Sequence, residues 1–214
     1  MVLKPQNREE WLEFRLKGIG GSDAGTVIGV NKYKTNVQLW EEKSGITIPE
    51  DISDKPAVAY GKNAEPHLRE LFRLDHKEYG LDYHEFYMYV NNEYPFIFAT
   101  LDGELIDKDD KKGILEIKTV TIQNSMQWAE WEDKIPDIYY AQILHQLAAT
   151  GWDFVILRAY IRYYKNDALR VAIRDYPIEK NDVQTDIDYL IKCESEFWKD
   201  VTNKTRPALL LPEI

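Results

Sequence analysis

Cysteine is almost absent from the sequence, since Cys193 is the only one in 214 residues. A lone thiol excludes an intramolecular disulfide framework, a cysteine-rich zinc site and a four-cysteine iron–sulfur cluster. The four histidines do not replace the missing thiols, because none has a His-Glu-x-x-His or comparable zinc-ligand spacing. The sequence therefore carries no signature of a metal site built on sulfur or nitrogen ligands.

Long apolar runs are also missing. No stretch approaches the roughly 18 apolar residues that a membrane-spanning helix needs, and the N-terminal MVLKPQNREEW has no apolar signal core. The chain shows no internal repeat, no low-complexity segment and no long Pro/Gly/Ser linker. These absences predict a soluble, cytoplasmic protein in which residues 1–214 form a single domain, and 44% hydrophobic residues exclude a disordered chain.

Positive charge is in deficit, with 27 Lys and Arg against 37 Asp and Glu and a formal net charge of −10. Proteins that coat nucleic acid usually carry net positive charge, so the balance argues weakly against that class. It is compatible with a protein that holds DNA in one basic groove, because net charge averages over the whole surface.

Helical and extended patterns alternate along the chain. Asn7 and Glu10 resemble a capping box, Ser22 or Asp23 can cap a short helix, and Pro66 is expected to bend a longer one. The predicted helices cover residues 7–16, 22–28, 36–43, 56–75, 137–150 and 179–200. Aromatic and β-branched residues predict strands over 83–90, 95–106, 113–120, 153–164 and 169–176. This order predicts an α/β fold with a mixed central β-sheet flanked by helices, whose strand-rich middle forms a meander.

The most informative segment is 96–119, which reads as two antiparallel strands joined by the polar turn 107–112. If the turn is centred near residue 109, Asp102 lies directly opposite Glu116. Facing side chains in an antiparallel pair are only about 5 Å apart at Cβ, so two carboxylates there repel unless a cation lies between them. Mg²⁺, or Mn²⁺ in its place, is the natural candidate because hard cations prefer oxygen ligands.

Side-chain alternation adds a lysine to this pair. In a strand Glu116 and Lys118 point to one face while Leu115 and Ile117 point to the other. Lys118 can then reach a water or a phosphate beside the metal, an arrangement that suits phosphodiester hydrolysis. A charged, solvent-facing strand is the alternative interpretation, because E-x-K triplets are common.

Three other features are consistent with the hydrolytic interpretation. Glu65 lies on or beside a helix that presents apolar residues to a core, so it can supply a third acidic group. Tyr139, Gln142 and Gln146 form one helical stripe, whose amides can orient a water or a phosphate. A further pair, Arg15 and Ser22, flanks a glycine-rich turn before a predicted helix, a setting that favours anions. Each also has a plain structural reading: a surface glutamate, a polar helix edge and a tight turn.

Taken together, the ordered motifs resemble the YqaJ-type viral recombinase and lambda exonuclease family of the PD-(D/E)XK nuclease superfamily. The resemblance spans roughly residues 11–150. It rests on Arg15-x(6)-Ser22, Gly61-x(3)-Glu65-Pro66, Thr100-Leu-Asp102-Gly103, Leu115-Glu116-Ile117-Lys118 and Tyr140-x-Gln142-x(3)-Gln146.

This resemblance implies a restriction-endonuclease-like core and a Mg²⁺-dependent 5′→3′ exonuclease. Such an enzyme degrades one strand of linear double-stranded DNA and leaves 3′ overhangs for phage-type recombination. It implies metal binding by Asp102, Glu116, Glu65 and the Ile117 carbonyl, and catalytic roles for Lys118 and Gln142. It also implies that Arg15 and Ser22 bind the terminal 5′-phosphate. A trimeric ring, a single-strand annealing partner and a host-cytoplasm location for a phage-encoded chain follow from the same resemblance.

Two alternatives stay open on sequence grounds. A restriction or repair endonuclease of the same superfamily would use the same catalytic residues, so the motif alone does not separate the two activities. A DNA-end-binding module without turnover is the other alternative. Its weakness is that a decayed site would be free to lose one of its acidic residues or Lys118.

Overall fold

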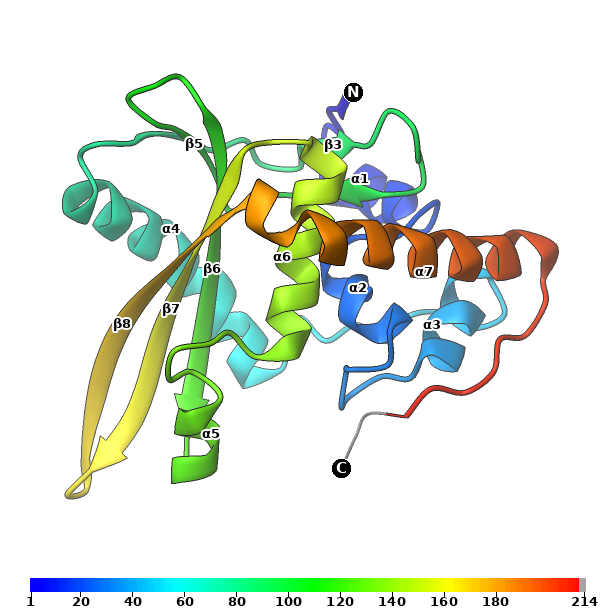
Figure 1. Cartoon of the computed structure of the whole chain (residues 1–214). Helices are drawn as coiled ribbons and strands as arrows, with labels where there is room; N and C mark the ends of the chain where they lie inside the picture. The colour runs from blue at the N-terminus through cyan, green and yellow to red at the C-terminus, as the bar shows by residue number, and fades with distance from the viewer. Residues whose placement is uncertain (212–214) are drawn as a thin grey trace.

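The computed structural model describes residues 1–211 (Figure 1). Its helices are α1 (Arg8–Arg15), α2 (Gly21–Val27), α3 (Asn36–Lys43), α4 (Pro56–Asp75), α5 (Ser125–Ala129), α6 (Asp137–Thr150), the 3₁₀ turn η1 (Lys180–Val183) and α7 (Gln184–Asn203). Its strands are β1 (Val2–Leu3), β2 (Gly80–Asp82), β3 (Met88–Val90), β4 (Phe98–Ala99), β5 (Gly103–Ile106), β6 (Lys112–Ile122), β7 (Phe154–Lys165) and β8 (Ala168–Glu179).

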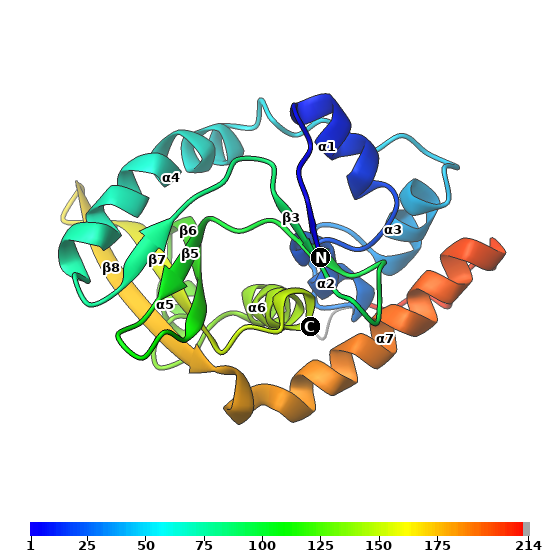
Figure 2. The ribbon, with the colours of Figure 1, turned by 90° about the horizontal axis from the view of Figure 1, so that it is seen from above.

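The main sheet has the strand order β2-β5-β6-β7-β8. Only the β6–β7 pair is parallel, and helix α6 makes the crossover that a parallel connection requires. Helix α4 packs Leu68 and Phe72 against one face, where they meet Leu115 of β6. On the other face lies α6, between the sheet and helices α2 and α7 (Figure 2). The expected α/β fold, a mixed sheet flanked by helices, is confirmed, but the parallel pair makes the meander only partial.

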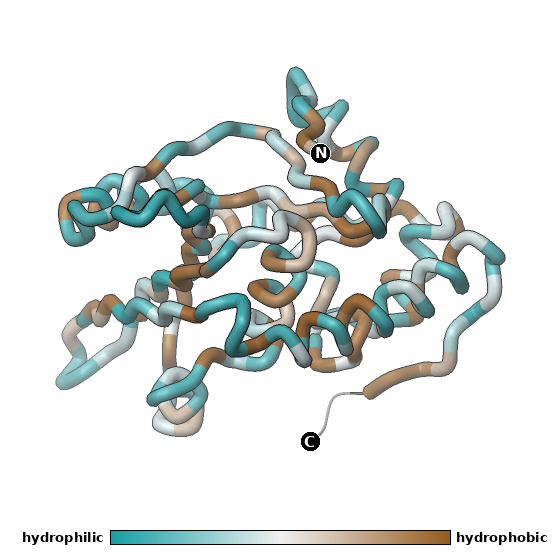
Figure 3. The backbone as a smooth tube through the Cα atoms, turned by 45° about the horizontal axis from the view of Figure 1, so that its top comes forward, coloured by the Kyte–Doolittle hydropathy of each residue, from teal (hydrophilic) through white to brown (hydrophobic). Residues whose placement is uncertain are grey.

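Apolar segments are concentrated along the central strands and α6, while the outer side of α4 is hydrophilic (Figure 3). This distribution follows from burial: Ile143 and Leu147 of α6 are fully enclosed, as is Val155 of β7. Within residues 1–211 no helix has the length and apolarity required to cross a bilayer.

Two predicted strands are wrong in extent. Of residues 83–90 only Met88–Val90 forms a strand, because Phe86 takes a positive φ of 64° that breaks the extended run. The segment predicted as one strand over 95–106 is two, β4 and β5, which belong to different sheets. Strand β4 pairs with β3 in a small sheet with β1, and the chain crosses to the main sheet through residues 100–102. This crossing places Asp102 at the junction of the two sheets.

Helix boundaries largely match the predicted ones, with one capping error. Asn7 caps α1 by accepting the Glu10 N–H, but the N-cap of α2 is Gly20. Ser22 and Asp23 therefore lie inside the first turn of α2, and the Asp23 carboxylate accepts the Gly20 N–H at 3.1 Å. The sequence misleads here because a capping box contains two side-chain hydrogen bonds. One is made by the N-cap side chain, and the other is made by an acidic residue three positions later, which here is Asp23.

Candidate active site

The predicted site residues lie around one cavity of about 200 Å³. They come from segments far apart in the sequence: the α1–α2 turn, α4, the β5–β6 hairpin and α6. Its lining is made of Trp11, Arg15, Gly20, Gly21, Ser22, Glu65, Phe98, Thr100, Asp102, Glu116, Ile117, Lys118 and Gln142. The β5–β6 register pairs Gly103 with Leu115, as the centred turn predicts, so Asp102 and Glu116 are the next positions along the same pair.

Glu116 is at the centre of a dense donor cluster. Its side chain is 3% exposed, and its Oε1 atom accepts from Lys118 Nζ at 2.5 Å and from Gln142 Nε2 at 2.7 Å. The Oε2 atom accepts from Gln146 Nε2 at 2.6 Å. Gln142 and Gln146 are one turn apart on α6, so that helix presents both amides to β6. These donors replace the water that the buried carboxylate has lost.

The Asp102 carboxylate is held by a backbone N–H. Its Oδ2 atom accepts the Ile117 N–H at 2.7 Å. Burial raises the pKa of Asp102 well above its usual range, and the charges of Glu116 and Glu65 raise it further. Lys118 lowers it without reversing the shift. Two acidic groups close enough to perturb Asp102 show that negative charge converges at this point.

Lys118 is present as an ammonium group. Burial lowers its pKa, but the charges of Glu116 and Asp102 outweigh burial, so the pKa of Lys118 is raised overall. Its Nζ atom also lies 5.2 Å from the centre of the Tyr139 ring. In this state Lys118 donates a hydrogen bond to Glu116 and offsets its charge.

Glu65 is the third acidic group, as the sequence predicts, and it is held by an arginine. Arg69 Nη2 pairs with Glu65 Oε1 at 2.5 Å, while Arg69 Nε donates to the Asp102 carbonyl at 2.5 Å. The guanidinium lies over the Tyr83 ring, 3.5 Å from its centre. Burial raises the pKa of Glu65, Arg69 lowers it, and Glu116 raises it again, with a net upward shift. Helix α4 is thus locked to Asp102 through Arg69.

The donor set fits a hard divalent cation. No group of three or more His, Cys, Asp or Glu side chains that could hold a metal occurs within residues 1–211. Mg²⁺ does not require such a cage, because it typically binds one or two carboxylates and completes its shell with waters and substrate phosphates. Asp102 and Glu116 meet that requirement, with Ile117 also at the cavity wall. A cation bound between these buried carboxylates would relieve their mutual repulsion.

Arg15 also lines the cavity, and it donates from Nη2 to Ser22 Oγ at 2.9 Å. Its guanidinium lies 4.9 Å from the Trp11 ring centre, and its side chain is 30% exposed. The cavity therefore brings carboxylates and a guanidinium together, as a phosphate next to a metal would need.

Comparison with known proteins identifies the family of this chain. Residues 10–153 match the family model described as the YqaJ-like viral recombinase domain. The chain belongs to this family. The uncharacterized protein YqaJ of Bacillus subtilis (strain 168) is 32% identical over 212 residues, which are 95% of this chain. The chain spans only 59% of the length of that relative.

Solved structures share the fold of this YqaJ-family chain. The alkaline exonuclease LHK-Exo of Laribacter hongkongensis superposes with a TM-score of 0.70 at 21% identity, covering 92% of this chain and 94% of that one. A phage-related exonuclease of Haemophilus somnus 129PT gives a TM-score of 0.58 at 12% identity, covering 87% and 96% respectively. These likenesses confirm the predicted fold.

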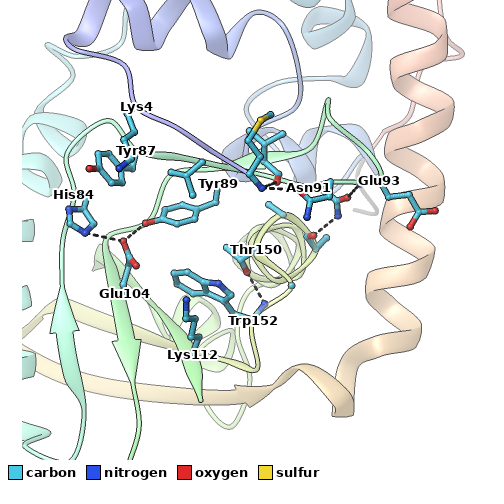
Figure 4. Close-up of a pocket in the computed structure, with 17 residues that line it drawn as sticks. Lys4, His84, Tyr87, Tyr89, Asn91, Glu93, Glu104, Lys112, Thr150 and Trp152 are labelled. Atoms are coloured by element: carbon cyan, nitrogen blue, oxygen red, sulfur yellow. Dashed lines mark hydrogen bonds and ion pairs between the residues drawn. The ribbon is translucent and has the colours of Figure 1, made fainter. Parts of the chain in front are cut away.

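The YqaJ-family chain also has a larger cavity, of about 570 Å³, that shares no lining residue with the candidate site (Figure 4). Its polar groups are mostly paired with one another. The Tyr89 hydroxyl donates to Glu104, His84 lies 3.5 Å from the same carboxylate, and the His84 ring stacks on Tyr87. The candidate site is therefore distinguished by the convergence of acidic and basic groups in the smaller cavity and not by cavity size.

Sequence reasoning missed three charged residues beside the site. Arg69 has a recognisable signal, because it is four residues after Glu65 on a helix. Asp23 directly follows Ser22, but its role depends on a contact with Lys43, twenty residues away on α3. Lys43 has no local signal, since only the tertiary fold brings α3 to the α1–α2 turn.

Proposed function

We propose that this YqaJ-family protein is a Mg²⁺-dependent exonuclease that digests one strand of linear double-stranded DNA from 5′ to 3′. The product would be a 3′ overhang for phage-type recombination. One observation carries the proposal: Asp102, Glu116 and Lys118 line the same cavity as Arg15 and Ser22. The names of the structural relatives, an alkaline exonuclease also solved in complex with dAMP and a phage-related exonuclease, support the reaction class.

Asp102 and Glu116 would hold the metal, with Glu65 and the Ile117 carbonyl as further oxygen donors. Bound Mg²⁺ supplies charge neutralisation at the scissile phosphate and lowers the pKa of a coordinated water. Glu65 would change partner, because its carboxylate is paired with Arg69 in the structure.

The protein's own residues divide the remaining work. Lys118, as an ammonium, would orient the attacking water and offset charge on the phosphate. Gln142 and Gln146 hold the Glu116 carboxylate in place through their amides. Arg15 and Ser22 would bind the terminal 5′-phosphate, because guanidinium and hydroxyl donors suit phosphate oxygens. Recognition of the end phosphate would confine cleavage to DNA ends.

Linear duplex DNA is the proposed substrate despite the net charge of −10. A trimeric ring threaded by DNA would keep the substrate bound by topology, so a strong nonspecific electrostatic attraction is not needed. A single-strand annealing protein that loads on the new overhang is the proposed partner. Both stay predictions that size measurement in solution and pull-down with a candidate annealing protein would check.

The decisive experiment is a time course on linear duplex DNA labelled at either the 5′ or the 3′ end, with Mg²⁺, Mn²⁺ or EDTA. We expect early release of 5′ label, persistence of 3′ label and no reaction in EDTA. Lys118→Met and Asp102→Asn should abolish digestion, while Lys111→Met, at an exposed lysine of the same hairpin, should not. Digestion by both active-site variants would contradict the proposal.

A closed circular duplex separates the main alternatives in the same assay. An exonuclease leaves the circle intact, whereas nicking or linearisation would assign the chain to the endonuclease class. Loss of reaction on every substrate, together with no Mg²⁺-dependent rise in Tm, would favour the DNA-end-binding module.

A further inference from the structure

Lys43 is a buried cation that joins the two segments bearing the proposed phosphate-binding groups. Its side chain is 5% exposed. The Nζ atom donates to Asp23 Oδ2 at 2.8 Å and to the carbonyl of Arg15 at 2.8 Å. The first contact fixes α2 and the second fixes the C-terminal end of α1, so one ammonium from α3 sets the spacing between them.

Asp23 has two cationic neighbours, which compete for it in a defined geometry. Besides the Lys43 contact, its Oδ1 atom lies 4.0 Å from Arg15 Nη2. Burial raises the pKa of Asp23, but the charges of Lys43 and Arg15 outweigh it and lower the pKa to about 2. The carboxylate is therefore ionised, and its shorter contact is with Lys43.

The charge balance explains why an acidic group can lie beside a proposed phosphate site. An unpaired Asp23 would repel a phosphate and would draw the Arg15 guanidinium onto itself. With Lys43 bound, the pair is neutral overall, and Asp23 attracts Arg15 only at the longer distance. The guanidinium keeps its hydrogen bond to Ser22 Oγ and remains 30% exposed at the cavity.

We propose that the Asp23–Lys43 ion pair positions Arg15 for a terminal 5′-phosphate and so sets the preference of this enzyme for phosphorylated DNA ends. Asp23 and Lys43 are positioning residues that act through Arg15 and do not touch the phosphate. The inference rests on the proposed exonuclease function and adds to it the residues that determine end specificity.

The test compares kcat/KM for linear duplexes that differ only in a 5′-phosphate or a 5′-hydroxyl. The wild-type protein is measured first, followed by Lys43→Met, Asp23→Asn and the double variant. We expect each variant to lose about tenfold or more of the 5′-phosphate preference, the size of effect expected when a charge-assisted contact is misplaced. A role limited to stability would lower kcat/KM on both substrates alike and leave their ratio unchanged.

Lys34→Met is the matched control, because Lys34 also forms an ion pair with α3, to Glu42 at 2.7 Å. Lys34 does not line the cavity. It should retain the wild-type ratio. The double variant protects the test against misfolding, since it removes the buried charge together with its partner. An unchanged ratio in the folded double variant would overturn the inference and leave the exonuclease function intact. If the wild-type protein digests the 5′-phosphate and 5′-hydroxyl duplexes equally, or digests neither, the inference and the Arg15 assignment are both overturned.

Discussion

The Asp102 carboxylate accepts a hydrogen bond from the backbone N–H of Ile117 at 2.7 Å, which binds the start of β5 to the middle of β6. Ile117 lies between Glu116 and Lys118, so this one contact fixes Asp102 relative to both. Arg69 holds the same residue from the other side through its carbonyl. Asp102 is therefore held in position by contacts within the chain itself, as a preorganised site requires.

The crowded carboxylates should cost stability in the absence of metal. The pKa of Asp102 is raised in the folded protein, so folding stability is lost as the pH rises from the unfolded value of 3.8 through the folded pKa. We expect Asp102→Asn to raise Tm in EDTA at neutral pH. We also expect Mg²⁺ to raise the Tm of the wild-type protein and not that of the variant. Thermal unfolding at several pH values, with and without Mg²⁺, measures both effects. A variant less stable than the wild type in EDTA at every pH would contradict the prediction.

The two glutamines on α6 should differ in what they support. Gln146 is buried, so Gln146→Ala removes a donor from Glu116 and should lower the free energy of unfolding by about 1–3 kcal/mol. Gln142 lines the open cavity, so Gln142→Ala should reduce digestion with a smaller loss of stability. Urea unfolding beside the end-label assay resolves the two. Equal losses of stability in the two variants would show that water does not replace the hydrogen bond that Gln142 donates to Glu116.

His145 of α6 and Glu194 of α7 form a fully buried pair, with Nδ1 2.6 Å from Oε1. Burial lowers the pKa of His145, but the charge of Glu194 and the hydrogen bond with it outweigh burial and raise the pKa above 6.5. Stability from this group is therefore complete below the unfolded pKa and is lost as the pH rises through the folded pKa.

We expect His145→Phe to lower the free energy of unfolding by about 3–5 kcal/mol, because it leaves Glu194 buried without its partner. Glu194→Gln should remove the alkaline loss of stability. Urea denaturation between pH 6 and 9 compares the variants with the wild type. A wild-type stability that does not change over this range would show that His145 is not charged in the folded protein.

Gly113 is a packing position at the start of β6. A Cβ there would lie 2.2 Å from ring atoms of Phe154 on β7. Gly113→Ala should therefore destabilise the protein by about 1–3 kcal/mol. The added variant Phe154→Leu should recover part of that loss, because it removes the obstructing ring. Calorimetric Tm values for the two single variants and the double variant test the coupling, and additive losses would exclude it.

The sequence predicted the hairpin and its register because the relevant interactions are local. The predicted polar turn at 107–112 and the alternation from Leu115 to Lys118 leave little freedom in strand pairing. The spacing of Gln142 and Gln146 likewise required one face of a helix, and α6 has the predicted bounds. The break between β4 and β5 was not predicted, because the apolar pattern continues through it while the chain changes sheets.

What the sequence determined by itself is the identity of the chemical groups: two carboxylates and a lysine on a hairpin, amides on a helix and an arginine near a glycine-rich turn. Their roles in DNA cleavage stay predictions. The tertiary structure decided which groups meet. Lys43 reaches Asp23, Arg69 reaches Asp102 and His145 reaches Glu194 only after helices distant in sequence have packed together. Charge pairing between elements depends on distance in space, and no local periodicity encodes that distance.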